Sequence, residues 1–204
     1  MLHEPVKTVL LVPSILLASI AFAIGASGNS LPQFALTDTA GQVHTSAEWA
    51  AKQAVVLFFV TTDCPLSNTY VPEMNRIAHE YGPRGVAFYA VQGDATISAS
   101  EVRRHAKEFG YTFPYLLDAQ ESLATFTGAT TTPEVAVLSP HGEVRYLGRI
   151  DNLVEDFGKQ RLRATEFDLR DALDAVLAGK VVPHPRTPAI GCAITPRSAV
   201  PPEK

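Results

Sequence analysis

The sequence predicts an α/β protein with a central mixed sheet flanked by helices. The residues 54–60 (AVVLFFV) form an unbroken apolar run, which is typical of a strand buried on both faces. An amphipathic helical pattern follows, and a second apolar strand pattern comes after it. The order strand, helix, strand, helix, hairpin and helix then predicts a layered α/β domain.

The elements follow from local patterns along the chain. Glycine and proline end the helices, at Gly82-Pro83, at Gly110 and at Gly179, and Pro140-His141-Gly142 predicts a hairpin turn. We expect an extended entry at 31–36, a short helical stretch from Ser46 to Trp49, and strands at 54–60, 86–91, 115–117, 135–138 and 143–147. Helices are expected from about Asn68 to Tyr81, from Ser98 or Ser100 to Phe109, over 121–126 and over 168–178.

The first residues have the pattern of a secretory signal peptide. Lys7 precedes an almost wholly apolar stretch over 9–24, and Ala21-Phe22-Ala23 resembles a cleavage site. The stretch is shorter than the roughly 20 residues that span a bilayer, so a retained anchor is the alternative to cleavage. We therefore expect a signal peptide over 1–26, export to the periplasm or another extracytoplasmic space, and no stable membrane embedding of the mature chain.

Composition excludes several classes of protein. The 204 residues have 46% hydrophobic and 19% charged residues and a net charge of -4, as in an ordinary globular domain. No basic stripe is present, so we expect no nucleic-acid partner. Two cysteines cannot make a disulfide scaffold, so Cys64 and Cys192 either pair or act as separate thiols.

Cys64 lies between the strand over 54–60 and the following helix. At a helix N-terminus a thiol meets free backbone N–H groups and the positive end of the helix dipole, which stabilise the thiolate. Pro65 suits the first turn, and Ser67 could donate a hydrogen bond to the sulfur, whereas a nearby Asp63 carboxylate would raise the pKa of the thiol. The alternative is a buried, inert cysteine.

Two segments resemble landmarks of the thioredoxin-like superfamily. The segment 55–65, which ends in Asp63-Cys64-Pro65, resembles the active-site strand and turn of that superfamily, and 128–138 resembles its cis-proline loop and the next strand. The resemblance spans about residues 31–178. It implies a thioredoxin-like fold, a cis peptide bond at Thr132-Pro133, a Pro133 that faces Cys64, and a neighbouring backbone that pairs with substrate peptides. The chain then divides into a signal peptide (1–26), a thioredoxin-like redoxin domain (27–180) and a proline-rich arm without regular structure (181–204).

The motif departs from that of thioredoxin. Cys64-Pro65-Leu66-Ser67 is C-x-x-S, so the local resolving thiol is absent. The chain also resembles the alkyl hydroperoxide reductase and thiol-specific antioxidant group, the peroxiredoxins, because Thr61 and Cys64 match P-x-x-x-[TS]-x-x-C. Leu57 stands where that motif has proline. No arginine lies beside Pro133, although Arg149 could reach the site.

Cys192 lies in an apolar stretch, Ile190 to Ile194, inside the proline-rich arm. One interpretation is that the arm folds back and Cys192 resolves Cys64 by forming a disulfide with it. There are two other interpretations. The cysteines could form a structural disulfide that pins the arm, or they could be two independent thiols. The segments around Gly148–Asn152 and Pro185–Cys192 resemble a bacterial branch of exported redoxins with a late cysteine, which supports an arm that is part of the domain.

The sequence thus predicts an exported thiol-dependent oxidoreductase with Cys64 as nucleophile, Cys192 as candidate resolver, and Thr61, Ser67 and Pro133 shaping the site. Its partners would be a thiol, disulfide or peroxide substrate and a thiol reductant. A peroxiredoxin-type thiol peroxidase is the first alternative. The second is a non-enzymatic module that binds a protein partner or copper, through Cys64, Cys192 and a histidine such as His184. Histidine spacing gives no zinc motif, and we expect no cofactor and no metal.

Overall fold

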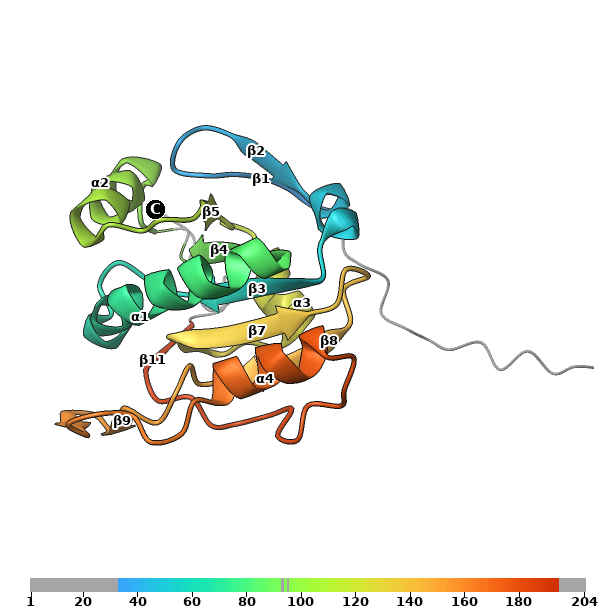
Figure 1. Cartoon of the computed structure of the whole chain (residues 1–204). Coiled ribbons are helices and arrows are strands. Elements are labelled where there is room, and N and C mark those ends of the chain that lie inside the picture. The colour runs from blue at the N-terminus through green and yellow to red at the C-terminus, as the bar shows by residue number, and fades with distance from the viewer. Residues whose placement is uncertain (1–32, 93, 95, 195–204) are drawn as a thin grey trace, which may run out of the picture.

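The computed structural model describes residues 33–92, 94 and 96–194 (Figure 1). The expected signal peptide over 1–26 and the last ten residues of the arm lie outside these ranges. Among the described residues, no helix is long and apolar enough to cross a membrane.

A five-stranded mixed sheet forms the centre, with the strand order β5-β4-β3-β7-β8. Strands β3 (Ala54–Phe59), β4 (Val86–Gln92) and β5 (Tyr115–Leu117) run parallel to one another. Strand β7 (Glu134–Leu138) is antiparallel to β3, and β8 (Val144–Gly148) is antiparallel to β7. The carboxyl end of β3 therefore meets the beginning of β7 at one edge of the sheet, with Phe59 opposite Glu134.

The central strand explains why both faces of the sheet are covered. Ala54, Val56 and Phe58 belong to one hydrophobic cluster, and the alternate residues Val55, Leu57 and Phe59 belong to another. The first cluster packs against α1 (Pro65–Tyr81), α2 (Ala99–Phe109) and α4 (Asp168–Leu177), and the second packs against α3 (Ser122–Thr127) and the short helix η1 (Ser46–Ala51). Figure 1 shows α1 and α4 side by side on one face of the sheet.

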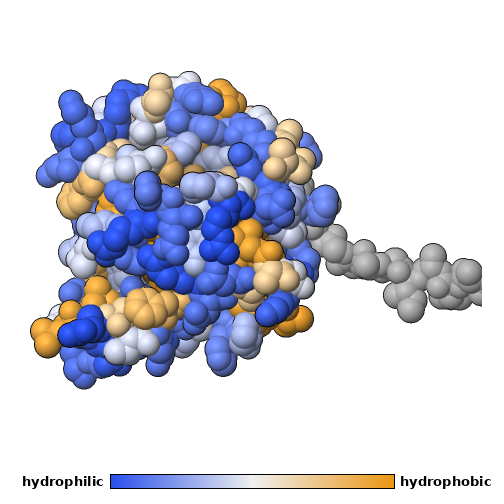
Figure 2. Space-filling model, in the orientation of Figure 1, coloured by the Kyte–Doolittle hydropathy of each residue, from blue (hydrophilic) through white to orange (hydrophobic). Residues whose placement is uncertain are grey.

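Smaller elements complete the described chain. Strands β1 (Ala35–Thr37) and β2 (Val43–Thr45) form a hairpin, and η2 (Gly82–Arg84) follows α1. A second hairpin, β9 (Val154–Asp156) with β10 (Lys159–Gln160), projects from the body before α4 (Figure 1). The face in Figure 2 is mostly hydrophilic, with small separate hydrophobic areas.

The predicted α/β class and mixed sheet are confirmed, and two expectations need correction. Helix α1 begins at Pro65, three residues before the predicted start, because Pro65 fits the first helical position. The arm was expected to lack regular structure, but Cys192–Ala193 forms strand β11, which pairs antiparallel with β6 (Thr131–Thr132). Neither residue of β11 is proline, so both have a backbone N–H that can take part in strand pairing, and the prolines elsewhere in the arm do not prevent it.

Candidate active site

Cys64 is the residue that caps the N-terminus of α1. Its carbonyl accepts the first helical hydrogen bond, from the Asn68 N–H at 3.2 Å, while its own backbone is extended. Pro65 follows at the first helical position, where no N–H is needed. The side chain therefore stands at the positive end of a 17-residue helix, directly after the buried strand β3.

The sulfur of Cys64 is enclosed by the arm and by the loop before β7. The Sγ atoms of Cys64 and Cys192 are 2.7 Å apart, and the Cys64 Sγ donates to the carbonyl of Thr132 at 3.1 Å. Cys64 has no solvent-exposed surface, whereas Cys192 is partly exposed. Ile190 and Cys192 pack against the same hydrophobic cluster that contains Cys64, so the arm covers this thiol.

The two thiols differ in acidity. Burial works to raise the pKa of Cys64, but hydrogen bonds from the Cys192 thiol and from the backbone and side chain of Ser67 outweigh it and lower this pKa. Burial, the hydrogen bond with Cys64, and the negative charges of Cys64 and Asp63 raise the pKa of Cys192 to about 11. Of the two thiols, Cys64 is therefore the one that loses its proton first.

The arm is held in place by backbone hydrogen bonds at two positions. In β11, Cys192 lies opposite Thr132 and Ala193 opposite Thr131, and the Ile194 N–H donates to Thr130 at 2.9 Å. Upstream, the arm runs along β8. There the Leu147 N–H donates to Pro185 at 3.0 Å, and the Thr187 N–H donates back to Leu147 at 3.3 Å.

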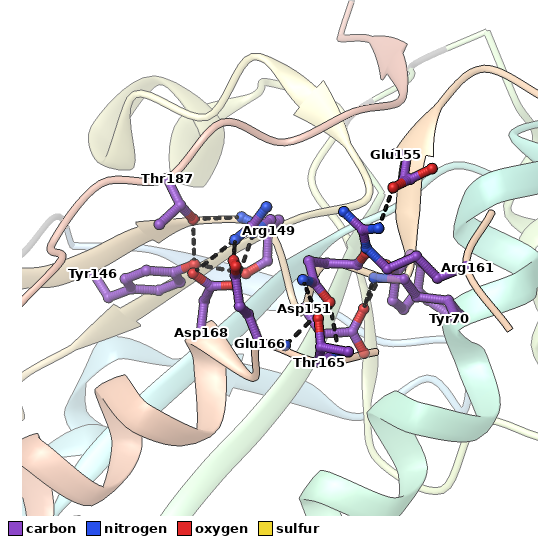
Figure 3. A network of polar contacts seen from close by, with 12 residues as sticks. Tyr70, Tyr146, Arg149, Asp151, Glu155, Arg161, Thr165, Glu166, Asp168 and Thr187 are labelled. Carbon is purple, nitrogen blue, oxygen red and sulfur yellow. Dashed lines mark hydrogen bonds and ion pairs between the residues drawn. The ribbon is translucent and has the colours of Figure 1, made fainter. Parts of the chain in front are cut away.

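A polar network fixes the middle of the arm (Figure 3). The Thr187 Oγ1 lies 2.6 Å from the Tyr146 hydroxyl and accepts from the Arg149 N–H at 3.2 Å. The Arg149 guanidinium in turn donates to Asp168 at 2.7 Å and to Glu166. The segment that leads into α4, which contains Glu166, is therefore joined to the arm through Arg149 and Thr187.

Two glycines allow the arm to lie close to the domain. A β-carbon on Gly191 would overlap the carbonyl oxygen of Thr132 and lie 2.7 Å from its carbonyl carbon. A β-carbon on Gly148 would overlap the Thr187 hydroxyl and lie 2.8 Å from the Thr187 nitrogen. No other residue fits either position without moving the arm.

The structure brings four of the five predicted site residues together. Cys64, Cys192 and Ser67 share the sulfur environment described above, and the Thr132–Pro133 peptide bond, which is cis, lies beside it. Thr61 is different, because its hydroxyl donates to the Asp63 carboxylate at 2.7 Å.

Two charged residues differ from what the sequence suggested. The Asp63 carboxylate acts on Cys192, whose pKa it helps to raise, and it is not among the main causes of the lowered pKa of Cys64. Arg149 does not take the place of a peroxiredoxin arginine, because its guanidinium is bound to Asp168 and Glu166.

Sequence reasoning missed Tyr111 and the structural use of Gly191. The Tyr111 hydroxyl is buried without a hydrogen-bond partner in the described structure, and burial followed by the negative charge of Cys64 raises the pKa of this phenol. Tyr111 therefore lies close enough to Cys64 for the charge of the thiolate to disfavour ionisation of the phenol. The glycine directly before Cys192 was a visible signal, since glycine often marks a close approach of two backbones.

The described residues do not form a cluster of metal-binding side chains. Within 33–92, 94 and 96–194, no group of three or more histidine, cysteine, aspartate or glutamate side chains could hold an ion. Cys64 and Cys192 point at each other, so the soft donors of the copper alternative are directed to one another.

Comparisons with known proteins show the family of this chain. The Redoxin family model matches residues 26–160. The thiol-disulfide oxidoreductase ResA of Geobacillus kaustophilus is 31% identical over 123 residues, which cover 60% of this chain and 68% of that protein. Its counterpart in Geobacillus thermodenitrificans is 29% identical over 150 residues, which cover 68% of this chain and 83% of that protein.

Solved structures have the same fold. A hypothetical protein from Sinorhizobium meliloti superposes with a TM-score of 0.73 at 32% identity, over 84% of this chain and 95% of that protein. A putative thiol:disulfide interchange protein DsbE from Chlorobium tepidum superposes with a TM-score of 0.57 at 19% identity, over 74% of this chain and 96% of that protein. The fold is thioredoxin-like, and the chain belongs to the Redoxin family.

Proposed function

We propose that this redoxin is a thiol–disulfide oxidoreductase whose redox couple is Cys64 and Cys192. The observation that carries the proposal is the 2.7 Å separation of two sulfurs that are 128 residues apart in the sequence. The sulfurs of a disulfide bond are about 2.05 Å apart, so oxidation of these two thiols to a disulfide requires only a small movement. The names of the ResA relatives support the same class of reaction.

Cys64 acts as the nucleophile of the couple. Its lowered pKa and its place at the N-terminus of α1 favour the thiolate, which is the reactive form. The backbone N–H and the hydroxyl of Ser67 stabilise this thiolate. When the thiol is neutral, it donates a hydrogen bond to the Thr132 carbonyl next to Pro133. Thr61 shapes the loop before α1 through its bond to Asp63.

The reaction proceeds by two thiol–disulfide exchanges. Once the arm moves away from Cys64, its thiolate attacks one sulfur of a substrate disulfide, and the other substrate sulfur leaves as a thiolate. Cys192 then loses its proton and attacks the Cys64 sulfur, which releases the second substrate sulfur as a thiolate. The substrate disulfide is reduced and the Cys64–Cys192 pair is oxidised, and an external thiol reductant restores the pair.

Residues 1–26 would direct this enzyme out of the cytoplasm. The apolar stretch over 9–24 and the Ala21-Phe22-Ala23 site support export, and an oxidising compartment suits a protein whose cysteines alternate between thiol and disulfide. N-terminal sequencing of the protein recovered from the periplasmic fraction would test this. A mature chain that begins near residue 24–27 is expected, and an intact Met1 in the cytoplasmic fraction would contradict export.

Redox equilibration tests the couple itself. We expect the purified protein, held in mixtures of reduced and oxidised dithiothreitol and then quenched in acid, to lose two hydrogen atoms in one transition. Peptide mapping should then find Cys64 joined to Cys192, and either Cys64→Ser or Cys192→Ser should abolish the transition. Formation of sulfenic acid at Cys64 by substoichiometric peroxide, with no exchange with dithiothreitol, would indicate a thiol peroxidase instead.

A further inference from the structure

A small cavity opens beside Cys192 and not beside Cys64. Its volume is about 150 Å³, and it lies where β3 and β4 end, between the loop after β3, helix α3 and the arm. Cys192 and Ile194 line it from the arm, and Thr132 lines it from β6. Cys64 is not part of its wall and has no exposed surface, so the cavity leads an incoming molecule to Cys192.

We propose that the cavity is the site where the external thiol attacks, and that it attacks the Sγ of Cys192 in the Cys64–Cys192 disulfide. This inference rests on the proposed function, because it names the sulfur through which that couple is reduced. The thiolate of the reductant forms a new S–S bond with Cys192, the Cys64–Cys192 bond breaks, and Cys64 leaves as a thiolate. A second reductant thiolate then attacks the reductant sulfur of the adduct, which releases Cys192 and the oxidised reductant.

The chemistry of the two sulfurs agrees with this direction. A disulfide is cleaved faster when the sulfur that leaves is the more acidic thiol. When Cys192 is part of a disulfide it has no proton to donate to Cys64, but the Ser67 N–H and hydroxyl still act to lower the pKa of Cys64, whereas burial and the charge of Asp63 act to raise that of Cys192. Cys64 is therefore the better leaving group. Cys64 also stays under the arm with the Ser67 N–H and hydroxyl beside it, and these groups stabilise the departing thiolate.

The charge around the cavity selects among thiols. Two acidic residues, Asp63 and Asp94, line the cavity. Among the described residues, no lysine, arginine or histidine lines it. The charge of Asp63 reaches the sulfur, since it contributes to the raised pKa of Cys192. Because like charges repel, the site should favour a thiol that carries a cationic group over one that carries a carboxylate.

A pulse of cysteamine on the oxidised protein identifies the attacked sulfur. The disulfide form is mixed with cysteamine, quenched in acid within a second, digested with pepsin and mapped by mass spectrometry. We expect the cysteamine adduct on Cys192 and a free thiol at Cys64. An adduct on Cys64 with a free Cys192 would overturn this inference and leave the proposed function intact, whereas an oxidised protein without a Cys64–Cys192 disulfide would overturn both.

Comparison of two thiols tests the role of the acidic residues. The rate of reduction by cysteamine, divided by that by 3-mercaptopropionate, is measured for the protein and for a small linear disulfide that corrects for intrinsic thiol reactivity. We expect a corrected ratio well above one that falls several-fold in Asp63→Asn and in Asp94→Asn. Glu143→Gln, in the turn between β7 and β8, is the matched control and should keep the ratio. A corrected ratio of one in the unsubstituted protein would overturn the assignment of the cavity.

Discussion

The α-carbon of Gly191 lies directly against the carbonyl group of Thr132, with no room for a side chain between them. This contact places the next residue, Cys192, opposite Thr132 in β11 and β6 and brings its sulfur to Cys64. The position of the second cysteine therefore depends on a backbone contact and on the two-residue strand that follows it.

The first prediction concerns Gly191→Ala, which should displace the arm. Overpacking costs about 1–3 kcal/mol, so the open arrangement should become roughly tenfold or more populated. We expect faster alkylation of Cys64 by iodoacetamide in the reduced protein, and slower formation of the Cys64–Cys192 disulfide. Peptide mapping after timed alkylation measures both. His184→Ala, at an exposed position of the same arm, is the control and should change neither rate; equal rates in both variants would contradict the closed-arm arrangement.

The second prediction concerns Ser67→Ala, which should weaken the Cys64 thiolate. The Ser67 hydroxyl is buried without a hydrogen-bond partner in the described structure, so it is free to donate to the Cys64 thiolate, whose pKa it lowers. A hydrogen bond to a charged group contributes about 1.5–3 kcal/mol, so alkylation of Cys64 at neutral pH should slow by about tenfold or more. Thr69→Ala removes a hydroxyl that bonds to the Pro65 carbonyl in the same helical turn, and it should leave this rate unchanged. The pH dependence of the alkylation rate would show whether the pKa or merely the access has changed.

The third prediction concerns the coupling of the two thiols. Because the hydrogen bond and charge of Cys64 help to raise the pKa of Cys192 to about 11, Cys64→Ser should lower that pKa. Thiolate absorbance as a function of pH measures it in a protein with a single cysteine. The Cys64→Ala variant, which also removes the possible hydroxyl partner, should lower it at least as far. A Cys192 that still titrates near pH 11 in both variants would show that Cys64 does not contribute to its pKa.

The fourth prediction concerns a buried histidine on the opposite side of the domain from the arm network. The His44 ring lies 3.1 Å from Asp38 and 3.1 Å from Glu48. Burial works to lower the pKa of His44, but these two carboxylates outweigh it and raise this pKa above 6.5. The pKa values of Asp38 and Glu48 are lowered, because hydrogen bonds outweigh the opposing effect of their burial.

The sign of the pH dependence follows from these shifts. The contribution of His44 to stability is complete below its ordinary pKa of 6.5 and is lost as the pH rises through its folded value. That of the carboxylates is complete above their ordinary values of 3.8 and 4.5 and is lost as the pH falls through their folded values. The cluster should therefore stabilise the fold most between pH 4.5 and 6.5.

Substitution of the histidine tests this window. His44→Ala should cost about 1–3 kcal/mol of unfolding free energy at pH 6, because it leaves the buried Asp38 without its partner. The loss should shrink as the pH rises above the folded pKa of His44. Urea unfolding at several pH values measures it, with His79→Ala on helix α1 as the control. A cost that is the same at all pH values would show that the ring contributes by packing and not by charge.

Local sequence patterns determined the layers of this protein and the position of Cys64. The apolar run at 54–60 could only be buried on both faces, and a cysteine directly before Pro65 and an amphipathic helix is bound to stand at that helix's N-terminus. These inferences held because each depends on residues near one another in the chain, where periodicity and capping chemistry decide the structure.

The tertiary structure alone decided what surrounds Cys64. The pairing of Cys192 with Thr132, the effect of the Asp63 charge on Cys192 and the use of Arg149 to bind Asp168 all join residues that are distant in sequence. Sequence patterns carry little information about such contacts, because many folds of the arm are compatible with the same prolines and glycines. The acidity of Cys64 and its cover by the arm arise from these contacts, since each depends on which atoms finally lie within a few ångströms of the sulfur.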